Sequence, residues 1–444
     1  MSEIYTAAHT ESAIDLYELR LSWLDEADIS VNEFNSVEER LNASIYDCAP
    51  AQDNEDLKNT SHQPEKKKTK KESTKEAECF VYLASRINSE KPEIDNAGYD
   101  LAYQWLALDQ KKSAAAEAAL SLYPDADQTR LLKLYDEQET LHPALFRIFR
   151  KQIQTLPLAM VSTAATAESS SSALIVEALN YAAANSDIGL DLFRTHYVPL
   201  LSGRTQFEAS IVAAALWGGM VRSDPDAIQA LSTALSHAGS ATEHAKLMRL
   251  AALTGNADFL PLLLMAAENN PETGYPLLVL YGQKSVMPEL LKGLEVAHTM
   301  EQAATAFSRL SDQFLPRIPR LTVVGEETDD DENASAKIPD TLIPDVRAAR
   351  DWWDKHQANW KADERWLFGK PATAAHLAAM SNKHAGRFGR DIMALLTLAQ
   401  KVPLNIPWEI WRARQQQLLA KKLAAQAATP AAKAATHPAS ARHA

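Results

Sequence analysis

Between about residues 205 and 295 the chain repeats one pattern of a turn signal, an apolar and alanine-rich helix, a second turn and a second helix. In the first helix, apolar positions recur every three to four residues, which indicates one buried helical face. These positions are Phe207, Ile211, Ala215, Gly218 and Val221. Units of roughly thirty to forty residues with this pattern are typical of stacked helical repeats, in which each helix pair buries its apolar face against its neighbours. The pattern predicts an all-α chain.

Helix-start signals and an internal echo define the repeat more closely. Residues 205–208 and 240–243 each read as a capping box, and Asp224-Pro225 places a cap directly before a proline that suits a first helical position. Residues 255–268 and 282–295 echo each other, with Gly, Pro, paired leucines and a final Glu in register. Drifting spacing and a proline in the second helix favour HEAT-like repeats over stricter repeat types. We therefore expect an α-solenoid of HEAT-like repeats, with the helix of residues 259–265 buried on both sides.

Changes in composition divide the chain into segments. Residues 58–75 are lysine-rich, residues 326–332 are acidic, and the last 20 or so residues are Ala, Pro and Thr-rich. The predicted order is a helical N-terminal module (1–50), a disordered Lys-rich insert (51–77), helical repeats (78–156), a linker (157–172), HEAT-like repeats (173–315), an acidic linker (316–344), an aromatic-rich helical C-terminal module that caps the solenoid (345–423) and a disordered tail (424–444).

Charge and apolar content narrow the class of protein. The net charge is −13 and 46% of residues are hydrophobic, which suits a large core and argues against nucleic acid as the main ligand. The lysine cluster reads either as a contact for an acidic surface or as a solvated loop. Since there is no secretory signal and no uncharged apolar run of the ~18 residues that a membrane helix needs, we expect a cytoplasmic protein without a membrane partner. Cys48 and Cys79 are expected to be free thiols.

The chain lacks the familiar catalytic, nucleotide-binding and zinc-protease motifs, so no enzyme activity, cofactor or metal is expected. Two aromatic and arginine-rich stretches, residues 365–371 and 386–391, are the strongest candidates for a binding surface. Arginine and tryptophan are enriched in binding hot spots. The candidate partner-binding residues are Arg365, Trp366, Arg387 and Arg390. Alternatively, the tryptophans pack beneath the arginines as the cap of the solenoid.

Short motifs along nearly the whole chain resemble one bacterial HEAT-repeat family of uncharacterised function, associated with type VI secretion gene clusters. The motifs are residues 9–13 with Leu19-Arg20, 37–43, 98–102, 306–310, 338–340 through Trp352-Trp353, 365–371 and 412–415. The chain departs from that family in its Lys-rich insert, its C-terminal tail and Ser44, where the family usually has histidine. The resemblance implies a helical scaffold in a Gram-negative cytoplasm and supplies no catalytic residues.

Three functions fit these features. The first is a non-enzymatic protein-binding scaffold that serves type VI secretion as an accessory, adaptor or chaperone and binds a spike component or an effector. The second is an immunity protein, since the negative charge suits a basic toxin. The third is a HEAT-like lyase or other ligand-handling protein, for which the sequence offers no nucleophile.

Overall fold

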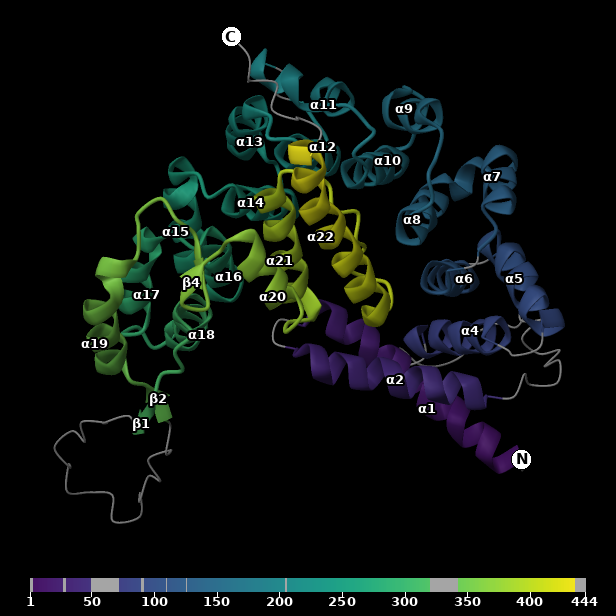
Figure 1. The fold of residues 1–444 in the computed structure, drawn as a ribbon, viewed down its shortest axis with the longest axis horizontal. Helices are drawn as coiled ribbons and strands as arrows, with labels where there is room; N and C mark the ends of the chain where they lie inside the picture. Colours follow the sequence, from purple (N-terminus) through teal and green to yellow (C-terminus); the bar gives the residue numbers. More distant parts are fainter. Residues whose placement is uncertain are drawn as a thin grey trace, which may run out of the picture. The chain divides into compact units, whose positions relative to one another are not determined.

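The computed structural model describes residues 3–26, 29–48, 72–88, 92–108, 110–124, 126–203, 206–319 and 342–435. This part of the chain is predominantly α-helical, as predicted, with two short antiparallel strand pairs (Figure 1). It divides into two compact units, unit 1 with residues 1–227 and 378–444, and unit 2 with residues 228–377. The predicted Lys-rich insert and acidic run lie mostly outside the described residues.

Unit 1 contains the N-terminal helices and the C-terminal end of the chain. Its helices are α1 (Glu3–Asp25), α2 (Val31–Asp47), α4 (Glu72–Ile87), α5 (Pro92–Leu106), α6 (Gln110–Leu122), α7 (Gln128–Glu137), η1 (Glu139–Leu141), α8 (His142–Gln152), α9 (Leu158–Thr166), α10 (Ser172–Ala184), α11 (Asp191–Leu201), α12 (Ala209–Val221), α21 (Gly386–Gln400) and α22 (Arg412–Ala435). Alternate helices pack on one another, α4 on α6, α6 on α8, α8 on α10 and α10 on α12 (Figure 1). Helix α21 contacts α1 and α12, and α22 contacts α2. The end of the chain therefore joins helices that are far apart in the sequence.

Unit 2 repeats the alternate packing on a smaller scale, with α14 on α16 and α16 on α18. Its elements are α14 (Ala241–Thr254), η2 (Ala257–Phe259), α15 (Leu260–Asn269), α16 (Pro271–Tyr281), η3 (Lys284–Val286), α17 (Met287–Gly293), α18 (Met300–Ser311), β1 (Arg317–Pro319), β2 (Leu342–Pro344), α19 (Val346–His356), η4 (Gln357–Asn359), β3 (Trp366–Leu367) and β4 (Lys370–Pro371). The boundaries between the units fall within α13 (Pro225–His237) and α20 (Ala374–Ser381). Strand β1 pairs with β2, and β3 pairs with β4 through a two-residue turn.

The two similar segments, residues 255–268 and 282–295, have the same local structure. Gly255 and Gly282 each end a helix in the left-handed conformation, with φ of +67° and +63°. A 3-10 turn follows each glycine, and then a helix with proline in its first turn. Leu263 and Leu290 occupy matching positions, and both are fully buried. The echo was therefore a correct guide to local structure.

Two details of the predicted repeat region are wrong, and one is confirmed. Ser240 accepts from the Glu243 amide at 3.3 Å while the Glu243 carboxylate accepts from the Ser240 amide at 3.1 Å, which confirms that capping box. The helix predicted to start directly after Thr205 begins later, at Ala209, with Glu208 as an N-cap that makes no side-chain cap bond, and Thr205 itself lies outside the described residues. Helix α15 is not buried on both sides, since Met265 is 49% exposed. Only one apolar face of this short helix meets the core.

Several predicted linkers contain regular structure. The proposed linker at 157–172 includes α9, whose Val161 and Ala165 are buried and which packs on α10. Helix α4 begins at Glu72, inside the predicted insert, and α22 continues to Ala435, inside the predicted tail. The ends of the predicted acidic linker form the β1–β2 pair. Alanine has the highest intrinsic helix propensity, and the contacts of α9 with α10 offset the less favourable threonine and serine residues of this segment.

The predicted C-terminal module at residues 345–423 is not one module. Its first part, with α19 and the β3–β4 hairpin, belongs to unit 2, whereas α21 and α22 belong to unit 1. Composition alone did not reveal this division, because aromatic residues occur on both sides of it. Each part completes a different core.

Candidate functional site

Arg365, the first predicted binding residue, lies on the C-terminal ends of two helices of unit 2. Its Nη2 donates to the carbonyls of Ala252 at 3.2 Å and Leu253 at 2.9 Å, and its Nε donates to Tyr281 at 3.1 Å. Helix C-termini carry partial negative charge and unpaired carbonyls, so a guanidinium is stabilised there. Burial lowers the pKa of Arg365 to about 10, which leaves it protonated at neutral pH.

The two echoing glycines make room for this arginine. A Cβ atom on Gly255 would lie 2.8 Å from Arg365 Nη2, and one on Gly282 would lie 2.8 Å from Arg365 Cγ. Both positions also have positive φ, which favours glycine. The repeat and the motif at residues 365–371 therefore form one structural feature.

Trp366, the second predicted binding residue, belongs to the core of unit 2. It is 7% exposed and stacks on Trp360 with ring centroids 4.5 Å apart, and Trp360 meets Trp353 edge-on at 5.3 Å. The turn after it is held by Phe368 N donating to Arg309 O at 2.7 Å and Gly369 N donating to Leu310 O at 2.8 Å. Arg365 is half-buried and Trp366 is buried, so both side chains are engaged in contacts within unit 2.

Arg387 and Arg390, the other two predicted residues, lie at the start of α21 in unit 1. This helix start is docked on the α1–α2 connection, where Arg387 N donates to Glu26 O at 2.8 Å and Ala385 N donates to Ile29 O at 2.9 Å. The Arg390 guanidinium lies over the Trp408 ring at 4.8 Å. The Arg387 side chain is exposed. Of the four predicted residues, Arg387 is therefore the most open to a partner.

A buried ionic cluster that the sequence analysis did not assign joins both ends of the chain within unit 1. Arg20 and Glu38, only 2% and 5% exposed, are joined by Arg20 Nε donating to Glu38 Oε1 at 2.8 Å. Arg20 Nη2 also donates to Glu409 O at 2.7 Å, and Glu38 Oε2 accepts from Arg412 N at 2.7 Å. The Arg20 guanidinium lies 5.0 Å from the Trp411 ring centroid. The cluster fastens the segment before α22 to α1 and α2.

The sequence held a usable signal for this cluster. Arg20 falls in the apolar stripe of α1, and Glu38 falls in that of α2. The buried stripe neighbours are Ala13, Leu16, Tyr17 and Leu24 for Arg20, and Phe34, Val37, Leu41 and Ile45 for Glu38. A charge in such a stripe needs a partner when it is buried. Arg20, Glu38 and Arg412 also lie in motifs that carry the family resemblance. The sequence alone does not show that these motifs meet.

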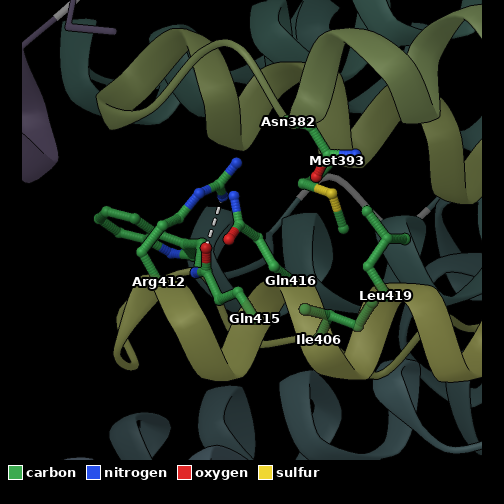
Figure 2. Close-up of a pocket in the computed structure, with 8 residues that line it drawn as sticks. Asn382, Met393, Ile406, Arg412, Gln415, Gln416 and Leu419 are labelled. Atoms are coloured by element: carbon green, nitrogen blue, oxygen red, sulfur yellow. Dashed lines mark hydrogen bonds between the residues drawn. The ribbon is translucent and has the colours of Figure 1, made fainter. Parts of the chain in front are cut away.

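Beside the cluster lies a small pocket whose labelled residues come from α21, α22 and their flanking segments (Figure 2). Arg412 Nη1 donates to Gln415 Oε1 at 2.6 Å, and Asn382 and Met393 lie across from this pair (Figure 2). The cavity is about 10 Å³, which is room for a single water molecule. It is therefore too small to be a substrate site as it stands.

A charged surface runs across α6, α8 and α10 of unit 1. Arg147 bridges Glu117 at 2.7 Å and Glu177 at 3.5 Å, and Lys151 also contacts Glu117 at 3.4 Å. Next to them Arg150 Nη2 pairs with Glu409 Oε1 at 2.9 Å. Burial alone would raise the pKa of Glu409, but Arg150 and Lys151 outweigh burial and hold it below 4.5.

The described residues contain no group of three or more His, Cys, Asp or Glu side chains able to hold a metal ion. In the same part of the chain no helix is both long and apolar enough to cross a membrane. Neither Cys48 nor Cys79 forms a disulfide among the described residues, and both are buried. Comparison with family models, curated proteins and solved structures found no match for this chain.

Proposed function

We propose that this protein is a non-enzymatic protein-binding scaffold, built as an α-solenoid of HEAT-like repeats. The observation that carries the proposal is the unbroken series of alternate-helix contacts from α4 through α6, α8 and α10 to α12. In stacked repeats such a series aligns one helix of each pair into a continuous surface, and these surfaces commonly bind proteins. The matching local structures at Gly255 and Gly282 support repeats of the same kind in unit 2.

The family resemblance suggests the partner, a spike component or an effector of type VI secretion, with the chain acting as an accessory, adaptor or chaperone. Three of the motifs behind the resemblance meet in the cluster of Arg20, Glu38 and Arg412. Two others meet where Phe368 and Gly369 bond to Arg309 and Leu310. These contacts give the motifs a common structural role and leave Arg387 as the candidate for partner contact.

The test is affinity capture of the tagged full chain from a strain with an active type VI system, followed by mass spectrometry. We expect recovery of a spike component or an effector. Arg387→Glu should weaken recovery, whereas Arg347→Glu, a charge reversal at an exposed arginine of unit 2, should not. If neither the wild-type chain nor the control recovers any secretion component, the type VI assignment is wrong.

A further inference from the structure

Residues 401–411, here called the strap, have no regular secondary structure, and their last residues contact α8 and the end of α6. Glu409 pairs with Arg150 of α8. At the end of the strap the Trp411 ring meets Tyr123, just after α6, edge-on at a centroid distance of 6.1 Å. Between these two residues, Ile410 is 1% exposed. The strap therefore presents an acidic, an apolar and an aromatic side chain in succession.

The backbone of the strap is left-handed at two positions. Lys401 ends α21 as a left-handed C-cap with φ of +56°, and Asn405 has φ of +48°. Such residues are held in the left-handed region by their surroundings, and they cluster in segments that clamp or switch. Both lie before the contact residues, where a change in backbone conformation would swing the strap away from α8.

Near the strap contacts, several buried polar atoms lack a hydrogen bond within the described part of the chain. The Tyr123 hydroxyl, Arg150 Nε and Gln152 Oε1 are buried and have no hydrogen-bond partner among the described residues. Unpaired buried polar groups disfavour the arrangement that leaves them so. A ligand that pairs these groups could compete with the strap.

The charges beneath the strap indicate what would replace it. Without Glu409, the ion-paired side chains of this surface are three cations and two carboxylates, and Arg150 is left without an ion-pair partner. The cations are Arg147, Arg150 and Lys151, and the carboxylates are Glu117 and Glu177. The net charge of the whole chain is −13, so general attraction does not draw an acidic partner to this surface. Electrostatics therefore favours binding only of a segment that places a carboxylate next to Arg150, as Glu409 does.

The hydrogen bonds of Arg20 restrict the shape of such a segment. Arg20 Nη2 donates to the backbone carbonyls of Glu409 at 2.7 Å and Ile410 at 3.3 Å. Interior carbonyls of an α-helix are already paired along the helix, so a helical ligand could not accept these bonds. An extended or irregular segment can.

We propose that the strap is releasable, and that the α6–α8 surface beneath it binds an extended partner segment with an acidic, an apolar and an aromatic residue in succession. This inference rests on the proposed scaffold function and names the surface and ligand class. The strap then acts as an internal competitor, because it occupies the surface until a partner segment displaces it. The Arg20–Glu38 pair lies within α1 and α2, so it stays intact when the strap leaves.

The test is a titration of the full chain with a labelled synthetic peptide of residues 403–413. The receptors are the wild type, a weakened-strap variant with Glu409→Ala and Trp411→Ala, and the same variant with Arg150→Ala added. We expect the weakened-strap variant to bind at least about tenfold tighter than the wild type, because removing a competing closed state raises apparent affinity. A peptide with Glu409→Gln should bind the same receptor about tenfold less tightly, and Arg150→Ala should remove binding.

If the weakened-strap variant keeps its far-ultraviolet circular dichroism but binds the peptide no better than the wild type, the strap is permanent core and the proposal is wrong. If this variant does not fold, hydrogen exchange of the wild type decides instead. Backbone amides of residues 408–411 should then exchange through local opening, well before those of α8. Exchange only on global unfolding would overturn the proposal. Neither measurement depends on type VI partners, so this inference and the affinity capture can fail separately.

Discussion

Both units fasten a late segment of the chain to earlier helices with a buried arginine, but the two arginines have different partners. In unit 1, Arg20 pairs with the Glu38 carboxylate and also donates to two strap carbonyls. In unit 2, Arg365 donates to three carbonyls at the ends of α14 and α16, and it pairs with no carboxylate in the described part of the chain. A buried guanidinium can therefore be held by a counterion or by helix ends alone.

Because one arginine has a carboxylate partner and the other has only carbonyls, removing one group should affect stability differently in the two units. Taking Glu38 away leaves a buried charge on Arg20 without its counterion, which is strongly unfavourable. Taking the Arg365 guanidinium away leaves only carbonyls, which are neutral. The stability of the fold should therefore be much more sensitive to loss of Glu38 than to loss of the Arg365 guanidinium.

The largest effect should come from Glu38→Ala. We expect the free energy of unfolding to fall by about 3–5 kcal/mol, because Arg20 stays buried with no carboxylate. Denaturant titration followed by circular dichroism measures the loss. Glu39→Ala, an exposed glutamate next in the chain, is the matched control and should change little. A loss below about 1 kcal/mol for Glu38→Ala would break the comparison between the units.

Leu263→Ala should have the next largest effect, because it tests the apolar core of unit 2 without touching any charge. Leu263 is fully buried in α15, so we expect a loss of about 2–5 kcal/mol by the same titration. Met265→Ala, on the exposed side of the same helix, should cost less than about 0.5 kcal/mol. Equal losses for the two variants would mean that α15 is buried on both sides after all.

Arg365→Met should be milder than Glu38→Ala. It removes three hydrogen bonds to carbonyls but leaves no unpaired charge, so we expect a loss of about 1–3 kcal/mol. Arg347→Met, at an exposed arginine of α19, controls for the loss of charge. If Arg365→Met is as damaging as Glu38→Ala, helix ends alone do not explain how Arg365 is held.

The smallest effect concerns the ion pair of Glu409 with Arg150. The folded-state pKa of Glu409 lies below its usual 4.5, so its contribution is full above pH 4.5 and is lost as pH falls through the folded pKa. We expect Glu409→Gln to lower stability by about 1 kcal/mol at pH 7, because the pair is partly exposed. Melting temperatures of the variant and wild type, measured from pH 7 down to pH 3, should converge below pH 4.5. A constant difference would assign the effect to packing.

The local patterns in the sequence were good guides where one short segment contains the whole interaction. The Ser240–Glu243 capping box and the Asp224-Pro225 helix start formed because their donors and acceptors lie within a few residues. The recurring turn at Gly255 and Gly282 was predicted correctly for the same reason. The helix predicted to follow Thr205 directly starts later, at Ala209. Helix starts depend on packing as well as on the cap.

The binding residues were harder to predict than the helices. Arginine and tryptophan mark binding surfaces and packed interiors alike, so their composition could not separate Arg365 from Arg387. Gly255 and Gly282 decide the matter for Arg365, since only their missing Cβ atoms give its side chain room. That fact depends on residues 83 or more positions away in the chain, the separation of Arg365 from Gly282.

The sequence by itself determined the all-α class, the main helix starts and the recurring turn at Gly255 and Gly282, because helical periodicity and turn chemistry act over a few residues. Only the tertiary structure decided that the C-terminal region is shared between two units, and that Arg20, Glu38 and Arg412 form one cluster. The physical reason is that a buried charge requires a partner but does not specify where along the chain the partner lies.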